Sequence, residues 1–179
     1  MLKFALLFPI YLIVLFVLEL LAPVDRAVIA PWTGFLADMC GALMRLLDSS
    51  VVVHGNIIAG GAAGFAIAIE RGCNGVEAVI ILVASMLAYP ASWRQRAIGI
   101  GVGFVCVQAL NMVRIISLFY LGNWNRVWFD WFHLYVWQAL IVADALVVFL
   151  LWLSWIRRRT PDLPPPATPA APDAAMTPA

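Results

Sequence analysis

Four stretches of the chain are apolar enough, and long enough, to cross a membrane as helices. They cover residues 4–22, 75–93, 97–121 and 134–156. About 20 apolar residues are needed to span the hydrocarbon core of a bilayer as a helix. The second stretch is the weakest, because Glu77 lies inside it and Pro90 lies near its end. The pattern therefore predicts an all-α integral membrane protein with four transmembrane helices.

The segment between the first two stretches is too long to be a simple connection. Residues 31–47 place apolar side chains at the spacing of one helix face, with Asp38 and Arg45 on the other face. Two β-prone runs, 51–58 and 64–69, follow on either side of a Gly-rich segment. We therefore expect an amphipathic helix in the interface at the outer face of the membrane, and a small β-hairpin after it.

The composition agrees with a lipid environment. Of the 179 residues, 64% are hydrophobic and 12% are charged, whereas soluble proteins have roughly 45–50% and about 25%. These values exclude a disordered chain, a nucleic-acid-binding protein and a soluble enzyme, and they make the lipid bilayer the expected partner. The three cysteines lack the paired spacing of zinc sites and redox pairs. We therefore expect no metal and no cofactor.

Basic residues flank the apolar stretches in a regular order. They are Lys3, Arg94, Arg96 and the three arginines 157–159. With four crossings all of them fall on one side, which should be the cytoplasmic side, so both termini are expected in the cytoplasm. The first stretch has no cleavage site and should remain as an anchor. The membrane domain is expected to cover residues 1–159, and the Pro- and Ala-rich residues 160–179 to form a disordered cytoplasmic tail.

The few polar residues in or beside the apolar stretches are candidates for function, since burying them in a membrane is costly. Cys73 and His133 precede the second and fourth stretches, and Arg114 lies roughly 10 Å inside the outer end of the third. A long guanidinium can reach across most of that distance. Asn111 shares a helix face with Arg114, and Glu77 lies one turn below Cys73. We expect the thiol, imidazole and guanidinium to meet near the outer surface.

These three groups are sufficient for thiol acyl transfer. A nearby cation lowers the pKa of a thiol, and the resulting thiolate is the nucleophile. His133 can take the thiol proton and later give it to the leaving amine. Arg114 can stabilise the oxyanion. Asp130, three residues before His133, can orient the imidazole.

Two other functions agree with the same composition. One is a non-catalytic membrane scaffold or assembly subunit, in which the polar residues only stabilise the helix bundle. The other is a small transporter with Arg114 and Asp144 along its path. Cys40 and Cys106 lie on apolar helix faces and are expected to be core residues.

Three motifs resemble the exosortase/archaeosortase family. They are Glu-Arg-Gly-Cys-Asn-Gly-Val-Glu-Ala at 70–78, Ala-Leu-Asn-Met-Val-Arg-Ile at 109–115 and Phe-His-Leu-Tyr at 132–135. The resemblance covers about residues 2–157 and is closest to the H-type exosortases. Many exosortases have Ser after the Cys, whereas this chain has Asn74. That difference concerns the subtype rather than the chemistry. The chain is also shorter than the eight-span exosortases, so we expect no additional domain function.

The resemblance implies a membrane-embedded cysteine protease or transpeptidase of the bacterial cytoplasmic membrane. Its substrates would be exported proteins with a C-terminal sorting tail, built of a short motif, one transmembrane helix and a basic cluster. For the H-type the motif resembles Ile-Pro-Thr-Leu-x-x-Trp-Gly. The resemblance makes Cys73 the nucleophile, Arg114 the essential cation and His133 the general acid and base.

Overall fold

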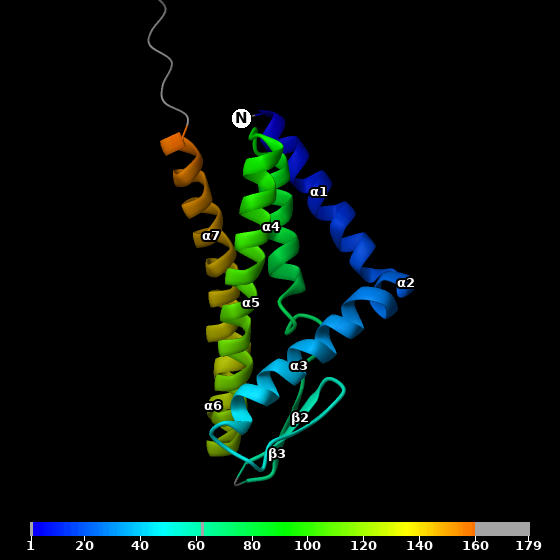
Figure 1. Cartoon of the computed structure of the whole chain (residues 1–179), viewed down its shortest axis with the longest axis vertical. Helices are drawn as coiled ribbons and strands as arrows, with labels where there is room; N and C mark the ends of the chain where they lie inside the picture. The colour runs from blue at the N-terminus through cyan, green and yellow to red at the C-terminus, as the bar shows by residue number, and fades with distance from the viewer. Residues whose placement is uncertain (1, 62, 160–179) are drawn as a thin grey trace, which may run out of the picture.

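The computed structural model describes residues 2–61 and 63–159. Its long helices run back and forth along one axis (Figure 1). Helices α1 (Leu2–Leu20) and α5 (Trp93–Trp124) run in one direction, and α4 (Val76–Ala88) and α7 (Trp137–Arg159) run in the other. Helix α1 therefore begins, and α7 ends, at one end of the molecule, here called the terminal end. The β-sheet lies at the opposite end, here called the sheet end.

Four helical stretches in the described part of the chain are long and apolar enough to cross a membrane, which confirms the predicted number. They are Lys3–Leu20, Ala22–Arg45, Trp93–Trp124 and Arg126–Arg158. The predicted stretch 75–93 instead contains α4, whose 13 residues extend about 20 Å, less than the roughly 30 Å of a hydrocarbon core. Helix α4 ends early because Tyr89, with ψ 137°, is extended ahead of Pro90.

The segment after α1 is almost continuously helical. It comprises α2 (Ala22–Val24), the π-helical η1 (Asp25–Ile29) and α3 (Ala30–Arg45), and α3 crosses α5 obliquely near the sheet end (Figure 1). The predicted helix therefore exists. The face that packs against the protein is largely different from the face of large apolar residues that was expected to lie in the membrane interface. The buried side chains are mainly small, among them Ala37, Cys40 and Gly41, because these allow close packing, whereas Phe35 and Met39 are exposed.

The small sheet has three antiparallel strands in the order β1 (Val52–His54), β2 (Ile57–Gly60) and β3 (Phe65–Ala68). The prediction of a two-stranded hairpin missed one strand. The run 51–58 folds back on itself at a two-residue turn, where Gly55 adopts a φ of 61° that favours glycine. Ile58 pairs with both Val53 and Ile67.

Two apolar clusters hold these elements together. The first joins α3, the sheet and α5 through residues such as Leu36, Ile58 and Phe119. The second joins α4, α5 and α7 through residues such as Leu82 and Trp152. After α5, Asn125 caps α6 (Arg126–Trp131), which continues through the π-helical η2 (Phe132–Val136) into α7. The predicted disordered tail, 160–179, lies outside the described residues.

Candidate active site

Cys73 lies in the turn that connects β3 to α4. Two glycines in left-handed conformations bend the chain in this turn, Gly72 with a φ of 79° and Gly75 with a φ of 75°. The backbone N–H of Cys73 donates to the carbonyl of Glu70 at 3.0 Å. The turn thus places Cys73 between the sheet and the start of α4.

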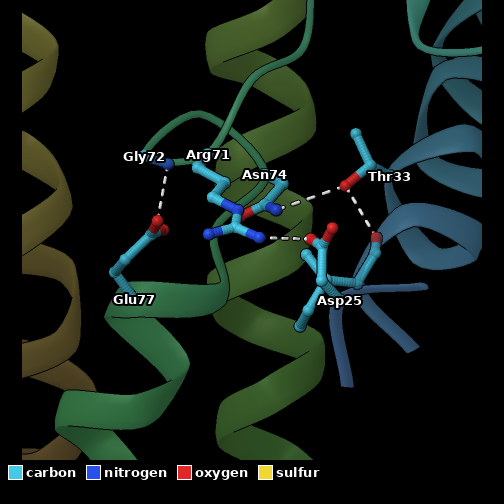
Figure 2. Close-up of polar contacts among 7 residues, drawn as sticks. Asp25, Thr33, Arg71, Gly72, Asn74 and Glu77 are labelled. Carbon is cyan, nitrogen blue, oxygen red and sulfur yellow. Dashed lines mark hydrogen bonds and ion pairs between the residues drawn. The ribbon is translucent and has the colours of Figure 1, made fainter. Parts of the chain in front are cut away.

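Side chains of η1 and α3 fix this turn (Figure 2). Asn74, which is 1% exposed, donates through Nδ2 to Thr33 Oγ1 at 3.2 Å and accepts at Oδ1 from the N–H of Val76 at 3.0 Å. Arg71 forms an ion pair with Asp25 at 2.6 Å. The turn is therefore attached to the neighbouring helices on both sides of Cys73.

Arg114 of α5 contacts the turn from the other side. Its guanidinium is buried, and Nη1 donates to the carbonyl oxygen of Gly72 at 3.2 Å, while Nη2 lies 3.7 Å from Cys73 Sγ. The N–H of Gly72 donates to Glu77 Oε1 at 2.5 Å. Within the described residues no carboxylate forms an ion pair with Arg114, neither Glu77 nor Asp144. Its charge therefore faces the Gly72 carbonyl and the thiol.

His133 of η2 completes the cluster. Its Nε2 lies 3.4 Å from Cys73 Sγ, and its ring packs on Phe129 with 5.5 Å between ring centroids. Asp130 does not take the predicted position. Its carboxylate lies 3.8 Å from Arg126 Nε on the exposed surface, and in the described part of the chain it forms no hydrogen bond with His133.

The structure thus brings Cys73, Arg114 and His133 together from three elements. A small cavity of about 40 Å³ adjoins all three side chains. Its other lining residues are apolar: Ile67, Ala68, Ile69, Ile115, Leu118 and Phe129. A carbonyl group that enters this space would lie beside the thiol and the guanidinium together.

The electrostatics of the thiol differ from the prediction. Burial raises the pKa of the Cys73 thiol, and Arg114 offsets only part of the increase, which Glu77 and Glu70 enlarge. Arg114 therefore lowers this pKa as expected, but burial, which the prediction left out, has the larger effect and the net direction is upward. A thiol that is protonated at neutral pH needs a base before it can attack, and His133 is the base in contact with it.

The other predicted residues fall into two groups. Asn111 is 3% exposed and lies beside the turn of Cys73. Its Nδ2 atom is 3.1 Å from the position that a Cβ on Gly75 would occupy. Cys40 is buried in α3, as expected of a core residue, whereas Cys106 is exposed on α5, so the expectation that it is a core residue is wrong; both are free thiols. No group of three His, Cys, Asp or Glu side chains that could hold a metal ion occurs among the residues the structure describes.

The sequence reasoning missed Gln108, Thr33 and Asp25. Gln108 is 5% exposed and contacts Gly75 beside Asn111. A signal for it was present, because Gln108 precedes Asn111 by three residues and is a polar residue inside a predicted span. Thr33 and Asp25 carried no such signal, since their partners Asn74 and Arg71 are distant in sequence.

Fold and site together define a helical membrane protein with a thiol, an imidazole and a buried guanidinium in contact. The family model described as Transmembrane exosortase (Exosortase_EpsH) matches residues 2–152. The chain therefore belongs to the transmembrane exosortase family, as its motifs predict, and the H-type resemblance is consistent with this match. No curated protein and no solved structure matches the chain. At the level of the family, membership supports a membrane transpeptidase or protease role with exported proteins as substrates.

Proposed function

We propose that this protein is a membrane-embedded cysteine peptidase or transpeptidase that recognises and cleaves the C-terminal sorting tail of exported proteins. One observation carries the proposal. Cys73 Sγ lies within 3.4 Å of His133 Nε2 and 3.7 Å of Arg114 Nη2, although the three residues come from three separate elements. A scaffold needs no such convergence of a nucleophile, a base and an unpaired cation.

The reaction proceeds through a thioester. His133 Nε2 takes the proton of the Cys73 thiol as Sγ attacks the scissile carbonyl carbon, and the carbonyl oxygen becomes an oxyanion. Arg114 stabilises that charge in a buried site. When the tetrahedral intermediate collapses, the C–N bond breaks, and His133 returns the proton to the leaving amine. Water or an acceptor amine then attacks the thioester and regenerates the thiol.

We further propose that the protein lies in the bacterial cytoplasmic membrane, with both termini cytoplasmic and Cys73 towards the outer face. The basic flanks support this orientation, because Lys3, Arg94 and Arg96 lie at the terminal end, where positive charge is typical of the cytoplasmic side. The sheet end, with the turn of Cys73, then faces the compartment into which substrates are exported.

Cleavage of a tailed protein by variants at matched membrane levels tests the proposal. Cys73→Ala, Arg114→Ala and His133→Ala should each nearly abolish cleavage, and double variants should be scarcely worse, because residues that act as a unit give non-additive losses. Cys40→Ala and Cys106→Ala are the matched controls and should cleave close to the wild-type rate. Added hydroxylamine should release a hydroxamate of the tail-free protein. Normal cleavage by Cys73→Ala would overturn the thiol mechanism.

A further inference from the structure

Unsatisfied buried polar atoms concentrate on one side of the active site. Ten buried side-chain nitrogen and oxygen atoms of the described residues have no hydrogen-bond partner, and five of them belong to Gln108, Asn111 and Trp32. Gln108 and Asn111 each leave both amide atoms unpaired. Leaving such a group unpaired costs about 1–3 kcal/mol. These amides are therefore expected to have a partner in the working protein.

The amide of Gln108 lines a groove. The groove has a volume of about 510 Å³ and lies between η1 and α3 on one side and α4 and α5 on the other. Trp32, Phe35, Val79 and Phe104 are among its lining residues, and the lining contains no charged side chain. We call this surface the Gln108 groove. It suits an apolar, uncharged occupant.

The Gln108 groove adjoins the turn that carries the nucleophile, because Val76, three residues after Cys73, lines it. A Cβ built on Gly75 would lie 3.0 Å from Gln108 Nε2 and 3.1 Å from Asn111 Nδ2, and Gly75 is two residues after Cys73. Asn111 is also three residues before Arg114, on the same face of α5. The two amides therefore lie beside the turn that carries the thiol.

We propose that the Gln108 groove binds the substrate tail on the carboxyl side of its scissile bond, and that Gln108 and Asn111 hydrogen-bond to the unwound backbone of that segment. This inference rests on the proposed function. A scissile peptide group in a helix is occupied by its own hydrogen bonds, so the tail must unwind beside Cys73. Each N–H and C=O exposed there, at the edge of the hydrocarbon, needs a partner.

The chemistry of the amides matches a peptide backbone rather than a lipid. Each amide offers N–H donors and one acceptor oxygen, which complement the C=O and N–H of a peptide group. An acyl chain offers neither. The apolar walls formed by Trp32, Phe35 and Phe104 then contact the first residues of the transmembrane helix of the tail. Water is the other possible partner of the amides, and the experiment distinguishes the two.

The first measurement is binding by the full chain carrying Cys73→Ala in lipid nanodiscs. The probe is a fluorescent peptide with the motif Ile-Pro-Thr-Leu-Ala-Ala-Trp-Gly, an apolar helix of about 20 residues and a terminal Arg cluster. Gln108→Leu should weaken binding about tenfold, the effect of one to two lost hydrogen bonds, and Asn111→Leu should have a similar effect. Gln138→Leu makes the same chemical change on an exposed position of α7 and should leave binding unaltered.

Misfolding is not expected to imitate this result. Gln108→Leu removes two unsatisfied buried atoms at nearly constant volume, so the thermal unfolding temperature should stay level or rise. If Gln108→Leu binds the peptide within twofold of its Cys73→Ala parent, the amides are hydrated and the inference is wrong.

The second measurement is cross-linking. Benzoylphenylalanine in place of Phe35, which lines the groove and is 52% exposed, should cross-link to the first turns of the helix in the peptide. The same label in place of Val105, which is 64% exposed on α5 and does not line the groove, should not. Equal yields at the two positions would show that lipid occupies the groove and would overturn the inference. Both measurements use the Cys73→Ala protein and report binding alone. A negative result in them would overturn this inference, whereas cleavage that does not depend on Cys73 would overturn the proposed function.

Discussion

The two sides of the Cys73–His133 contact are built differently. On the thiol side, the turn is fixed by a hydrogen bond that Arg114 donates and by two that Asn74 and Glu77 accept. On the imidazole side, His133 packs on the ring of Phe129, and its helix runs through a π-helical turn of five residues. The nucleophile is therefore positioned by directional bonds, and the base by packing. Substitutions in the turn should cost more activity than conservative changes around the imidazole.

The largest effect is expected at Arg114, since its planar fork bridges the Gly72 carbonyl and the thiol. Arg114→Lys keeps the charge but cannot make both contacts. Loss of one or two charge-assisted hydrogen bonds predicts about a hundredfold decrease in kcat/KM for tail cleavage. Arg126→Lys, at an exposed position, is the matched control and should lose less than twofold. If Arg114→Lys lost as little activity as Arg126→Lys, the charge of Arg114 alone would be required.

Gly75→Ala should have the next largest effect. A Cβ at this position meets Gln108 Nε2 at 3.0 Å, and the φ of 75° is unfavourable for alanine. We expect about 1–2 kcal/mol of destabilisation from the backbone alone, and about a tenfold loss of cleavage as the turn shifts. Gly55→Ala imposes a similar backbone penalty at a φ of 61°, where a Cβ would meet nothing within 4 Å. It should lower the unfolding temperature without reducing kcat/KM at a temperature where both variants are folded.

The pH dependence of the thiol should show a smaller effect. Because burial raises the pKa of Cys73, the thiolate forms above the pH range of an ordinary thiol, near 8.5. Alkylation by iodoacetamide should therefore rise with pH later in folded protein than in denatured protein. Arg114→Gln removes the cation that lowers this pKa, so its profile should move further up in pH.

Variants with Cys40→Ser and Cys106→Ser isolate the signal of Cys73 for this measurement. A profile that moves down in Arg114→Gln would mean that Arg114 does not lower the pKa of the thiol. Arg114 would then position the turn without stabilising the thiolate.

Residue chemistry predicted the site better than it predicted the contacts around it. Cys73, Arg114 and His133 could be brought together from sequence because each lies at or near the same end of an apolar stretch. The partners that hold the turn could not, since Thr33 and Asp25 lie about 40 residues from Asn74 and Arg71, and spacing gives no tertiary partner. The prediction for the thiol pKa counted the cation and left out burial, which is the larger effect.

The fold shows the same division between local and tertiary information. The number of candidate spans followed from hydropathy alone. The division of residues 51–58 into two strands, β1 and the start of β2, depends on a two-residue turn at Gly55, and the β-prone pattern of this run predicts a single strand. The apolar pattern of α3 did not identify the face that packs on the protein, because large apolar residues such as Phe35 are as stable facing lipid as facing protein. In a membrane, small residues mark the packed face more reliably than large ones do.

The smallest effect is expected at Asp130, the carboxylate that spacing placed beside the imidazole. Residues three and four apart on a helix both lie close together, so Asp130 can contact either Arg126 or His133, and it contacts Arg126. An exposed pair of this kind contributes about 0–1 kcal/mol. Asp130→Asn should therefore retain cleavage within about twofold of wild type, and the pH profile of kcat/KM should keep its shape. If the variant instead loses activity as strongly as His133→Ala does, Asp130 must orient the imidazole during the reaction, and directional bonds would then position both sides of the site.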